Sequence, residues 1–278
     1  MMRINLLLFL LISAFTLKAA NDNLPVGARS AGMAHASICI NDVWAVQHNQ
    51  AALANLKKQE VGVFSQIVYP NSKVLMNAVA VASPFKYGVI SVTFTRLGFK
   101  NLYNESKYGL GYSRQFGKAI SAGMQINYLN TFIGDNNYGS RGTLAVEAGF
   151  IVEVIKNLKV GVHIYNPTRS KTAQYNNERV PTIIKMGLQY TFSDKVFTTV
   201  EVEKDIANKP ILKIGAEYRI ADEIYLRGGL SNNPSLNAAG FGIELNKFNL
   251  DFAAAFHPQM GVSPQIGLRY KFGKRAYF

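Results

Sequence analysis

Cysteine is almost absent from this 278-residue sequence, and charged side chains are sparse. The single cysteine, Cys39, excludes an intramolecular disulfide framework and a cysteine-based metal site. We expect it to pack as a small apolar residue, because it lies too far from the start of the chain to be a lipoprotein anchor. Only 17% of the residues are charged, which is low for a soluble protein surface.

Long hydrophobic runs are also absent after residue 20, which excludes an inner-membrane helix. Residues 1–20 combine Arg3, an apolar core from Leu6 to Phe15, and a small-residue end at Ala19 and Ala20. This order is typical of a secretory signal peptide, and the core is shorter than the roughly twenty residues that a spanning helix needs. A buried N-terminal helix is the alternative interpretation. We therefore expect the protein to leave the cytoplasm.

The charge is strongly one-sided, at +13, and still +11 without the two cations Arg3 and Lys18. Nucleic-acid binding would require the Lys and Arg residues to cluster on one face or helix, but they are scattered along the chain. We therefore exclude nucleic acid as a partner. Outer-membrane lipids, including their anionic headgroups, are the expected partners instead.

Alternation with period two runs from residue 59 to the end of the chain. In residues 210–220, Leu212, Ile214 and Tyr218 fall on one face, whereas Lys213, Glu217 and Arg219 fall on the other. Residues 184–192, 248–256 and 265–272 repeat the pattern. Fourteen such segments are expected, approximately at 59–69, 73–84, 87–98, 104–116, 119–131, 140–153, 157–166, 181–193, 195–205, 208–219, 222–231, 235–245, 247–256 and 261–272.

These features predict an all-β fold, a transmembrane antiparallel β-barrel of about 14 strands with a short N-terminal helical hatch. The main alternative is a β-sandwich, but sandwich strands average about five or six residues, roughly half the length seen here. Small residues share the polar face with the charges, as suits a crowded interior: Gly123, Gly149, Gly161, Gly187, Gly215, Gly229, Gly242 and Gly267. Aromatic residues lie near strand ends on the apolar face, as in membrane-interface girdles: Tyr128, Phe192, Tyr218, Phe256 and Phe272.

The connections between the expected strands alternate between tight and longer ones. Asn246-Lys247 is a tight connection, whereas Pro167–Val180 is the longest of the other set. This asymmetry is typical of outer-membrane barrels, whose short turns face the periplasm. With an even strand number, both termini are expected to be periplasmic, in the outer membrane of a Gram-negative bacterium.

Residues 21–58 differ from the barrel segment at 59–278. Gly27 to Ala34 is rich in small residues, and Asp42 to Leu56 is expected to form a short helix capped by Asn41 or Asp42. We expect this segment to plug the lumen, and a periplasmic tail outside the barrel is the alternative. The plug candidates are Gly27, Arg29, Gly32, Met33, Asp42, Trp44 and Asn49.

The runs Pro25–Ala36 and Asn41–Leu53 resemble the N-terminal hatch of the FadL-like outer-membrane barrels, particularly the PorV/PorQ family of Bacteroidetes. That family shares GAR-x-x-GMG followed by D-x-x-A-x-x-x-NPAGLA; here Ala34 replaces the last glycine and Gln50 replaces the proline. The resemblance implies a fourteen-stranded barrel with a hatch. It also implies a role in type IX secretion, with secretion-system proteins or exported cargo as partners.

Catalysis and metal binding are not expected. The four histidines, His35, His48, His163 and His257, lack the spacing of a zinc site, and no segment resembles the motif of a barrel phospholipase or protease. We therefore expect no enzyme activity, no catalytic residues, no metal and no cofactor. The terminal Phe278, with Tyr270 and Phe272, resembles the last strand that the barrel assembly machinery recognises during biogenesis.

The polar face of the strands carries charges of both signs. The expected lumen-facing charges are Glu147, Glu153, Lys185, Glu201, Glu203, Lys213, Glu217, Arg219, Arg227, Glu244, Asp251, Arg269 and Lys271. They can pair across neighbouring strands around a plug, which is the favoured interpretation, or line a water path.

Two functions follow from these observations. The main hypothesis is a non-enzymatic PorV/PorQ-type accessory or docking component of protein secretion or envelope machinery. The alternative is a FadL-like transporter of small hydrophobic solutes, although the polar loop Pro167–Val180 argues against a fatty-acid funnel.

Overall fold

The computed structural model describes residues 23–68, 73–100, 102–135, 139–171 and 179–272. The predicted signal peptide and the terminal Phe278 lie outside these residues. No helix within the described ranges is long and apolar enough to cross a membrane.

Fourteen antiparallel strands close into one barrel, which confirms the predicted fold class. Every predicted strand is present, and the boundaries differ by at most three residues. The strands are β1 (Gln59–Ile67), β2 (Leu75–Phe85), β3 (Gly88–Phe99), β4 (Tyr103–Phe116), β5 (Ile120–Ile133), β6 (Gly139–Ile155), β7 (Leu158–Tyr165), β8 (Ile183–Ser193), β9 (Val196–Asp205), β10 (Ile211–Ala221), β11 (Ile224–Ser231), β12 (Leu236–Leu245), β13 (Phe248–His257) and β14 (Gly261–Phe272).

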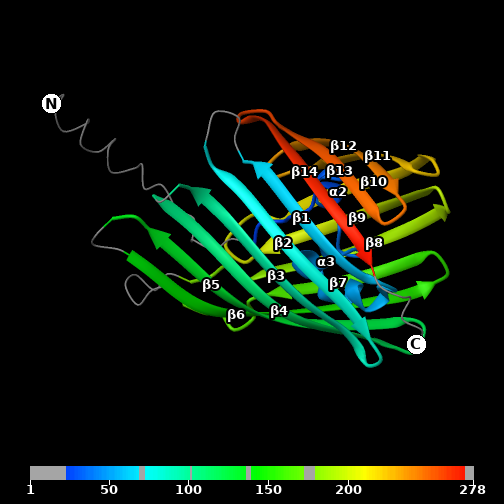
Figure 1. Ribbon diagram of the computed structural model, residues 1–278, viewed down its shortest axis with the longest axis horizontal. Coiled ribbons are helices and arrows are strands. Elements are labelled where there is room, and N and C mark those ends of the chain that lie inside the picture. The colour runs from blue at the N-terminus through cyan, green and yellow to red at the C-terminus, as the bar shows by residue number, and fades with distance from the viewer. Residues whose placement is uncertain (1–22, 69–72, 101, 136–138, 172–178, 273–278) are drawn as a thin grey trace.

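Closure comes from the pairing of the first and last strands. β1 pairs with β14 from Gln59 opposite Phe272 to Gln66 opposite Gln265, so neither strand is left as an edge. Every other strand pairs with its sequence neighbours (Figure 1). The hydrogen bonds of the backbone are thereby satisfied within the wall, as a barrel in hydrocarbon requires.

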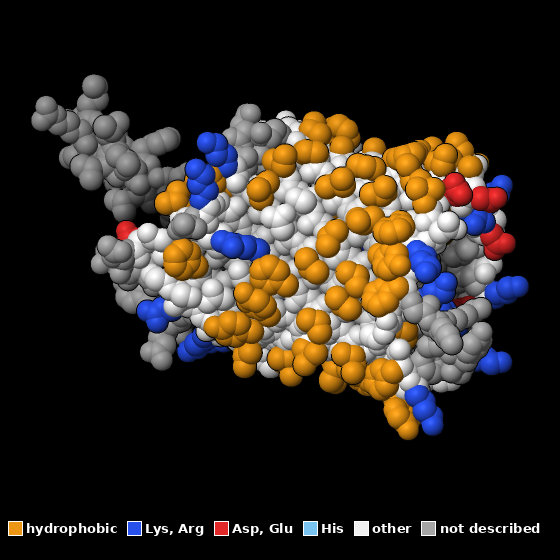
Figure 2. Space-filling view, viewed as in Figure 1, with side chains coloured by type: hydrophobic (Ala, Val, Ile, Leu, Met, Phe, Trp, Pro, Cys, Tyr) orange, Lys and Arg blue, Asp and Glu red, His pale blue; other side chains and the backbone are white. Residues whose placement is uncertain are grey.

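The alternation predicted from the sequence sets which side chains face outward. The outward positions carry exposed apolar residues, such as Val92, Leu110 and Ile126, which are 52%, 62% and 59% exposed. Figure 2 shows these side chains as a band across the barrel, with Lys and Arg beyond it at both ends. An apolar belt between two charged ends is what a bilayer-spanning barrel presents to lipid.

The two ends of the barrel differ in their connections. At the end that we call the turn end, strands are joined by two or three residues; at the loop end, by three to seventeen. The longest connection, 166–182, follows the short strand β7, and its two described ends are joined where Asn166 Nδ2 donates to Val180 O (2.8 Å). Val180 there joins a buried cluster with Leu129 and Tyr165.

Candidate functional site

The candidate site is the lumen together with residues 23–58, which we call the hatch. Asn23 lies toward the loop end, beside Lys107 of β4, and Lys58 leads into β1 at the turn end. Almost every residue between them is buried within the barrel (Figure 1). The described chain therefore crosses the lumen from one end to the other, while Phe272 lies at the turn end.

The hatch contains three short helical segments: α2 (Ala28–Ala31), α3 (Ala45–His48) and the 3-10 helix η1 (Gln50–Asn55). The predicted single helix over Asp42–Leu56 is wrong, because Asn49 has extended backbone (φ −164°) and breaks it into α3 and η1. The Asn49 side chain accepts from Ala51 N and so caps η1. Asp42 accepts from Trp44 N (2.9 Å), so it caps the turn that precedes α3.

A girdle of glycines on the inner face of the wall makes room for the hatch. A side chain at any of these positions would meet hatch atoms within 3.5 Å: Gly62, Gly123, Gly149, Gly161, Gly187, Gly215, Gly229, Gly240 and Gly267. At Gly229, for example, a Cβ atom would lie 2.2 Å from the carbonyl carbon of Met33. Gly32 of the hatch meets Gly240 at similarly close range. The girdle lets hatch backbone approach wall backbone around most of the barrel.

Trp44 anchors the apolar half of the interface. Its ring packs edge-on against Phe64 of β1 and lies against both Gly27 and Gly62. Small side chains of β2 complete this cluster, since Ala78 and Ala80 are fully buried. A large ring among small wall residues fills the lumen on the side of β1 to β3.

A closed ring of alternating charges holds the other half. Its members are three arginines and three carboxylates, linked in the order Arg29, Glu217, Arg227, Asp251, Arg269, Asp42 and back to Arg29. Arg29 donates two hydrogen bonds to the Glu217 carboxylate, from Nε (2.8 Å) and from Nη2 (2.7 Å). Because Arg29 and Asp42 belong to the hatch and the other four to strands, the ring ties the hatch to β10, β11, β13 and β14.

A second cluster fastens the middle of the hatch. Glu201 of β9 accepts from the backbone N–H groups of Ser37 (2.9 Å) and Ile38 (3.0 Å). Lys213 pairs with both Glu201 (3.1 Å) and Glu203 (2.6 Å), and Lys185 lies 3.5 Å from Glu203. The carboxylate of Glu201 is thus neutralised while it binds hatch backbone.

A third cluster lies toward the loop end. Glu147 of β6 pairs with Lys107 of β4 (2.5 Å) and with His163 (3.0 Å), and it also accepts from Gln50 of the hatch (2.9 Å). Lys107 donates in addition to Asn23 (2.8 Å) and Gln47 (2.9 Å) of the hatch. The cluster binds the start of the hatch and the segment from Gln47 to Gln50 to the same part of the wall.

The predicted lumen charges all fall on the inner face, and most take part in these clusters. Glu244 pairs with Lys271 (2.9 Å) near the turn end, and Arg219 and Glu153 lie at the same end outside the clusters. Sequence reasoning missed Lys107 and Glu60, which pairs with Arg269 (3.4 Å). Both residues occupy inward-facing positions in the alternating pattern of β4 and β1, and this pattern could have identified them.

The buried histidine and cysteine of the hatch are chemically quiet. Burial lowers the pKa of His48 to about 4, and its Nε2 donates to Val26 O (2.8 Å). Burial also raises the pKa of the Cys39 thiol to about 12. The described residues contain no group of three or more His, Cys, Asp or Glu side chains that could hold a metal ion.

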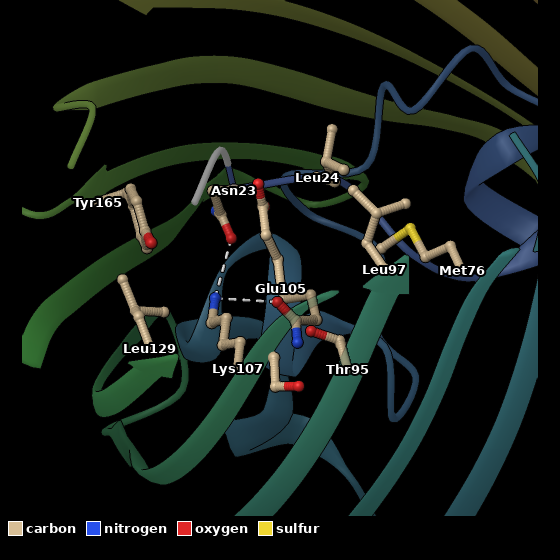
Figure 3. A pocket seen from close by; sticks show the side chains of 11 residues that line it. Asn23, Leu24, Met76, Thr95, Leu97, Glu105, Lys107, Leu129 and Tyr165 are labelled. Atoms are coloured by element: carbon tan, nitrogen blue, oxygen red, sulfur yellow. Dashed lines mark hydrogen bonds between the residues drawn. The ribbon is translucent and has the colours of Figure 1, made fainter. Parts of the chain in front are cut away.

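A small recess opens between the hatch and the wall toward the loop end (Figure 3). Leu129 and Tyr165 stand on one side of it, Leu24, Leu97 and Met76 on the other, and Lys107 lies between them. Its volume is about 30 Å³. A larger cavity of about 710 Å³ lies under the hatch at the turn end, lined by Lys57, Lys58, Glu60, Glu244, Lys271 and neighbouring polar residues.

Comparison with known proteins identifies the fold and gives no family. No protein-family model and no curated protein sequence matches the chain. The solved CymD monoaromatic hydrocarbon channel is similar over 92% of this chain and 100% of its own, with a TM-score of 0.73 and 13% identity. The P. putida toluene transporter TodX is similar over 91% of this chain and 100% of its own (TM-score 0.70, 11% identity). A Pseudomonas aeruginosa FadL homologue is similar over 90% of this chain and 99% of its own (TM-score 0.66, 10% identity).

Proposed function

We propose that this protein is an outer-membrane transporter that admits small, uncharged, largely apolar solutes through the recess above the hatch. The observation that carries the proposal is the recess itself, where five apolar or aromatic side chains converge on the loop-end surface of the hatch. Pockets of this kind, mostly apolar with a few placed polar groups, are typical of small-molecule sites. The similar solved structures include channels whose titles name monoaromatic hydrocarbons and toluene.

The charge state of the recess favours an uncharged solute. Its lining contains the carboxylate of Glu105 and one cation, Lys107, and an ammonium group has three donors. Those donors are directed to Asn23, Gln47 and Glu147, and Glu147 neutralises the charge. A solute carboxylate would have to displace these partners, whereas an apolar ring or chain need only contact Leu24, Leu97 and Leu129.

The recess is so small that the hatch must move before a solute can enter. A volume of about 30 Å³ is close to the space of one water molecule, which is too small for an aromatic ring. Asn23 and Leu24, at the start of the hatch, line the recess. We propose that a solute first displaces them and then passes when the hatch shifts against the glycine girdle.

The proposed membrane and orientation follow from the barrel. The loop end faces the outside of the cell, and the turn end, with Gln59 and Phe272, faces the periplasm. This orientation rests on the short turns and longer loops that such barrels place on the two sides of the membrane. Membership of the PorV/PorQ branch, and with it a docking role in secretion, is supported only by the resemblance of residues 25–53. The transporter proposal is preferred because it is the one that the recess and the similar solved structures support.

Uptake by whole cells tests the proposal. Cells that display the protein in an intact outer membrane should take up labelled toluene at low concentration faster than cells without it, and should not gain uptake of benzoate, its charged counterpart. Leu24→Trp, which fills the recess, should abolish the gain, and Leu102→Trp, an exposed loop-end residue (61% exposed), should not. Equal toluene uptake with and without the protein would refute the proposal.

A further inference from the structure

The excess positive charge of the chain lies outside the lumen. All thirteen ion pairs among the described residues are luminal, and they involve seven Lys or Arg residues and eight carboxylates. The interior is therefore close to neutral. At the loop end the described cations outnumber the carboxylates: Lys73, Arg96, Lys100, Arg141, Arg169, Lys171, Arg179, Lys204 and Lys209 against Glu105, Asp135 and Asp205.

Arg96 projects outward from the face of β3, three residues before that strand ends at Phe99. It lies on the same face of β3 as Ile90, Val92 and Phe94, and it is exposed. Its Nε donates to Asn104 of β4 (3.0 Å), which fixes the guanidinium against the wall. No carboxylate of the described ranges forms an ion pair with it. An outward arginine is costly at the bilayer midplane and is tolerated near the interface, so Arg96 marks the headgroup level.

A polar row crosses five strands beside Arg96, and it runs obliquely to the membrane plane because the strands of such barrels are tilted. The strand register places these outward residues side by side: Ser65, Asn77, Arg96, Ser106 and Asn130. One step nearer the turn end, the row reads Val63, Val79, Phe94, Tyr108 and Tyr128. The rings of Phe94 and Tyr108 are 4.9 Å apart, and those of Tyr108 and Tyr128 are 6.3 Å apart.

On β3, β4 and β5, aromatic residues thus lie between the apolar belt and the polar row, as they do near membrane interfaces. The exposed residues Ile67 and Leu75 of β1 and β2 lie one step beyond the row. We propose that the polar row binds the phosphorylated headgroup of an outer-leaflet glycolipid. Arg96 contacts a phosphate, since guanidinium recognises phosphate with two parallel N–H donors. The Asn77 amide and the Ser106 hydroxyl face the sugar. Asn130 offers only its amide oxygen, because its Nδ2 donates to Ser140 Oγ (2.7 Å) and Arg141 O (3.3 Å). Lys73 and Lys100, which flank the paired residues Leu75 and Gly98, add positive charge at the same edge.

The inference rests on the proposed membrane and orientation and is independent of the solute that the barrel transports. It commits to a glycolipid because the row itself places neutral sugar-binding groups beside a single cation, Arg96, whereas a simple phosphate site would be expected to gather cations within the row. Lys73 and Lys100 lie outside the row.

Native mass spectrometry of the purified full chain tests it, with bisphosphorylated lipid A as the probe. Arg96→Gln should weaken binding about tenfold or more, and Arg96→Lys should weaken it less. Arg114→Gln is the matched control: Arg114 is also outward and exposed, but it lies on β4 near the turn end, against Phe116. A heat-modifiability gel would show that each variant forms the barrel.

Equal affinity of wild type and Arg96→Gln would overturn the proposal, as would an equal loss in Arg114→Gln. If phosphatidylglycerol competes as well as lipid A, the glycolipid assignment is wrong and the row binds any lipid phosphate. Toluene uptake by Arg96→Gln should stay unchanged, so failure of this inference is distinguishable from failure of the transport proposal.

Discussion

Replacing Gly229 by valine is expected to release the hatch while leaving the barrel wall intact. Gly229 lies on the inner face of β11, and a Cβ atom there would be 2.2 Å from the carbonyl carbon of Met33 and 2.5 Å from Ala34 N. Both atoms are backbone, so no side-chain rotation can relieve the contact. Overpacking of this kind costs about 1–3 kcal/mol, and we expect the upper end here. A cost of about 3 kcal/mol shifts the balance between docked and released hatch by roughly 150-fold.

Planar-bilayer conductance measures the released state, because a lumen without its hatch passes ions. Gly229→Val should show openings far more often than wild type, and proteolysis should cut its hatch sooner. Gly228→Val is the matched control, since Gly228 is the adjacent outward residue and nothing lies within 4 Å of its Cβ position. If the two variants conduct equally, the glycine girdle does not hold the hatch and the reasoning fails.

Three further predictions concern the hatch. Arg29→Met should destabilise hatch docking by about 3–5 kcal/mol, because it leaves buried carboxylates unpaired. In a double-mutant cycle measured by thermal unfolding, adding Glu217→Gln should recover part of this loss. Strictly additive effects of the two substitutions would contradict the ion ring. The pKa of His48 is about 4 when docked, below its usual value of about 6.5, so a released hatch binds a proton that the docked hatch does not. The docked hatch should therefore be fully stable above pH 6.5, and its docking free energy should weaken by up to about 3 kcal/mol toward pH 4. The loss should be smaller in His48→Gln. Identical acid profiles of wild type and His48→Gln in the conductance assay would count against this. Cys39, with its pKa near 12, should resist maleimide at pH 8 and react after unfolding, and rapid labelling of the folded protein would show that the hatch is open.

The wall was predictable because its physics is local. An inward residue and an outward residue alternate in every strand, so period two identified all fourteen strands and the inner face of Lys213, Glu217 and Arg269. Strand ends differ from the prediction by up to three residues, as at β10, where pairing begins at Ile211 and not at Asn208.

The hatch was predictable in position and not in detail. Its small residues suggested a plug, but the break at Asn49 depends on a wall contact, since Gly149 lies against the Asn49 side chain. The closed ion ring also joins residues as far apart as Arg29 and Glu217. No spacing along the chain encodes such a contact, because the barrel curvature decides which strands face the same part of the hatch.

Locking the hatch tests the central claim most directly. In a Cys39→Ala background, Ala28→Cys and Gly267→Cys would place two thiols on facing Cβ positions 3.5 Å apart, within the range of a disulfide. This bond would hold α2 to β14. We predict that cells displaying the oxidised variant take up toluene no faster than cells without the protein, and that a reductant restores uptake. Equal uptake by the oxidised and reduced forms would contradict the claim that solutes pass only when the hatch yields.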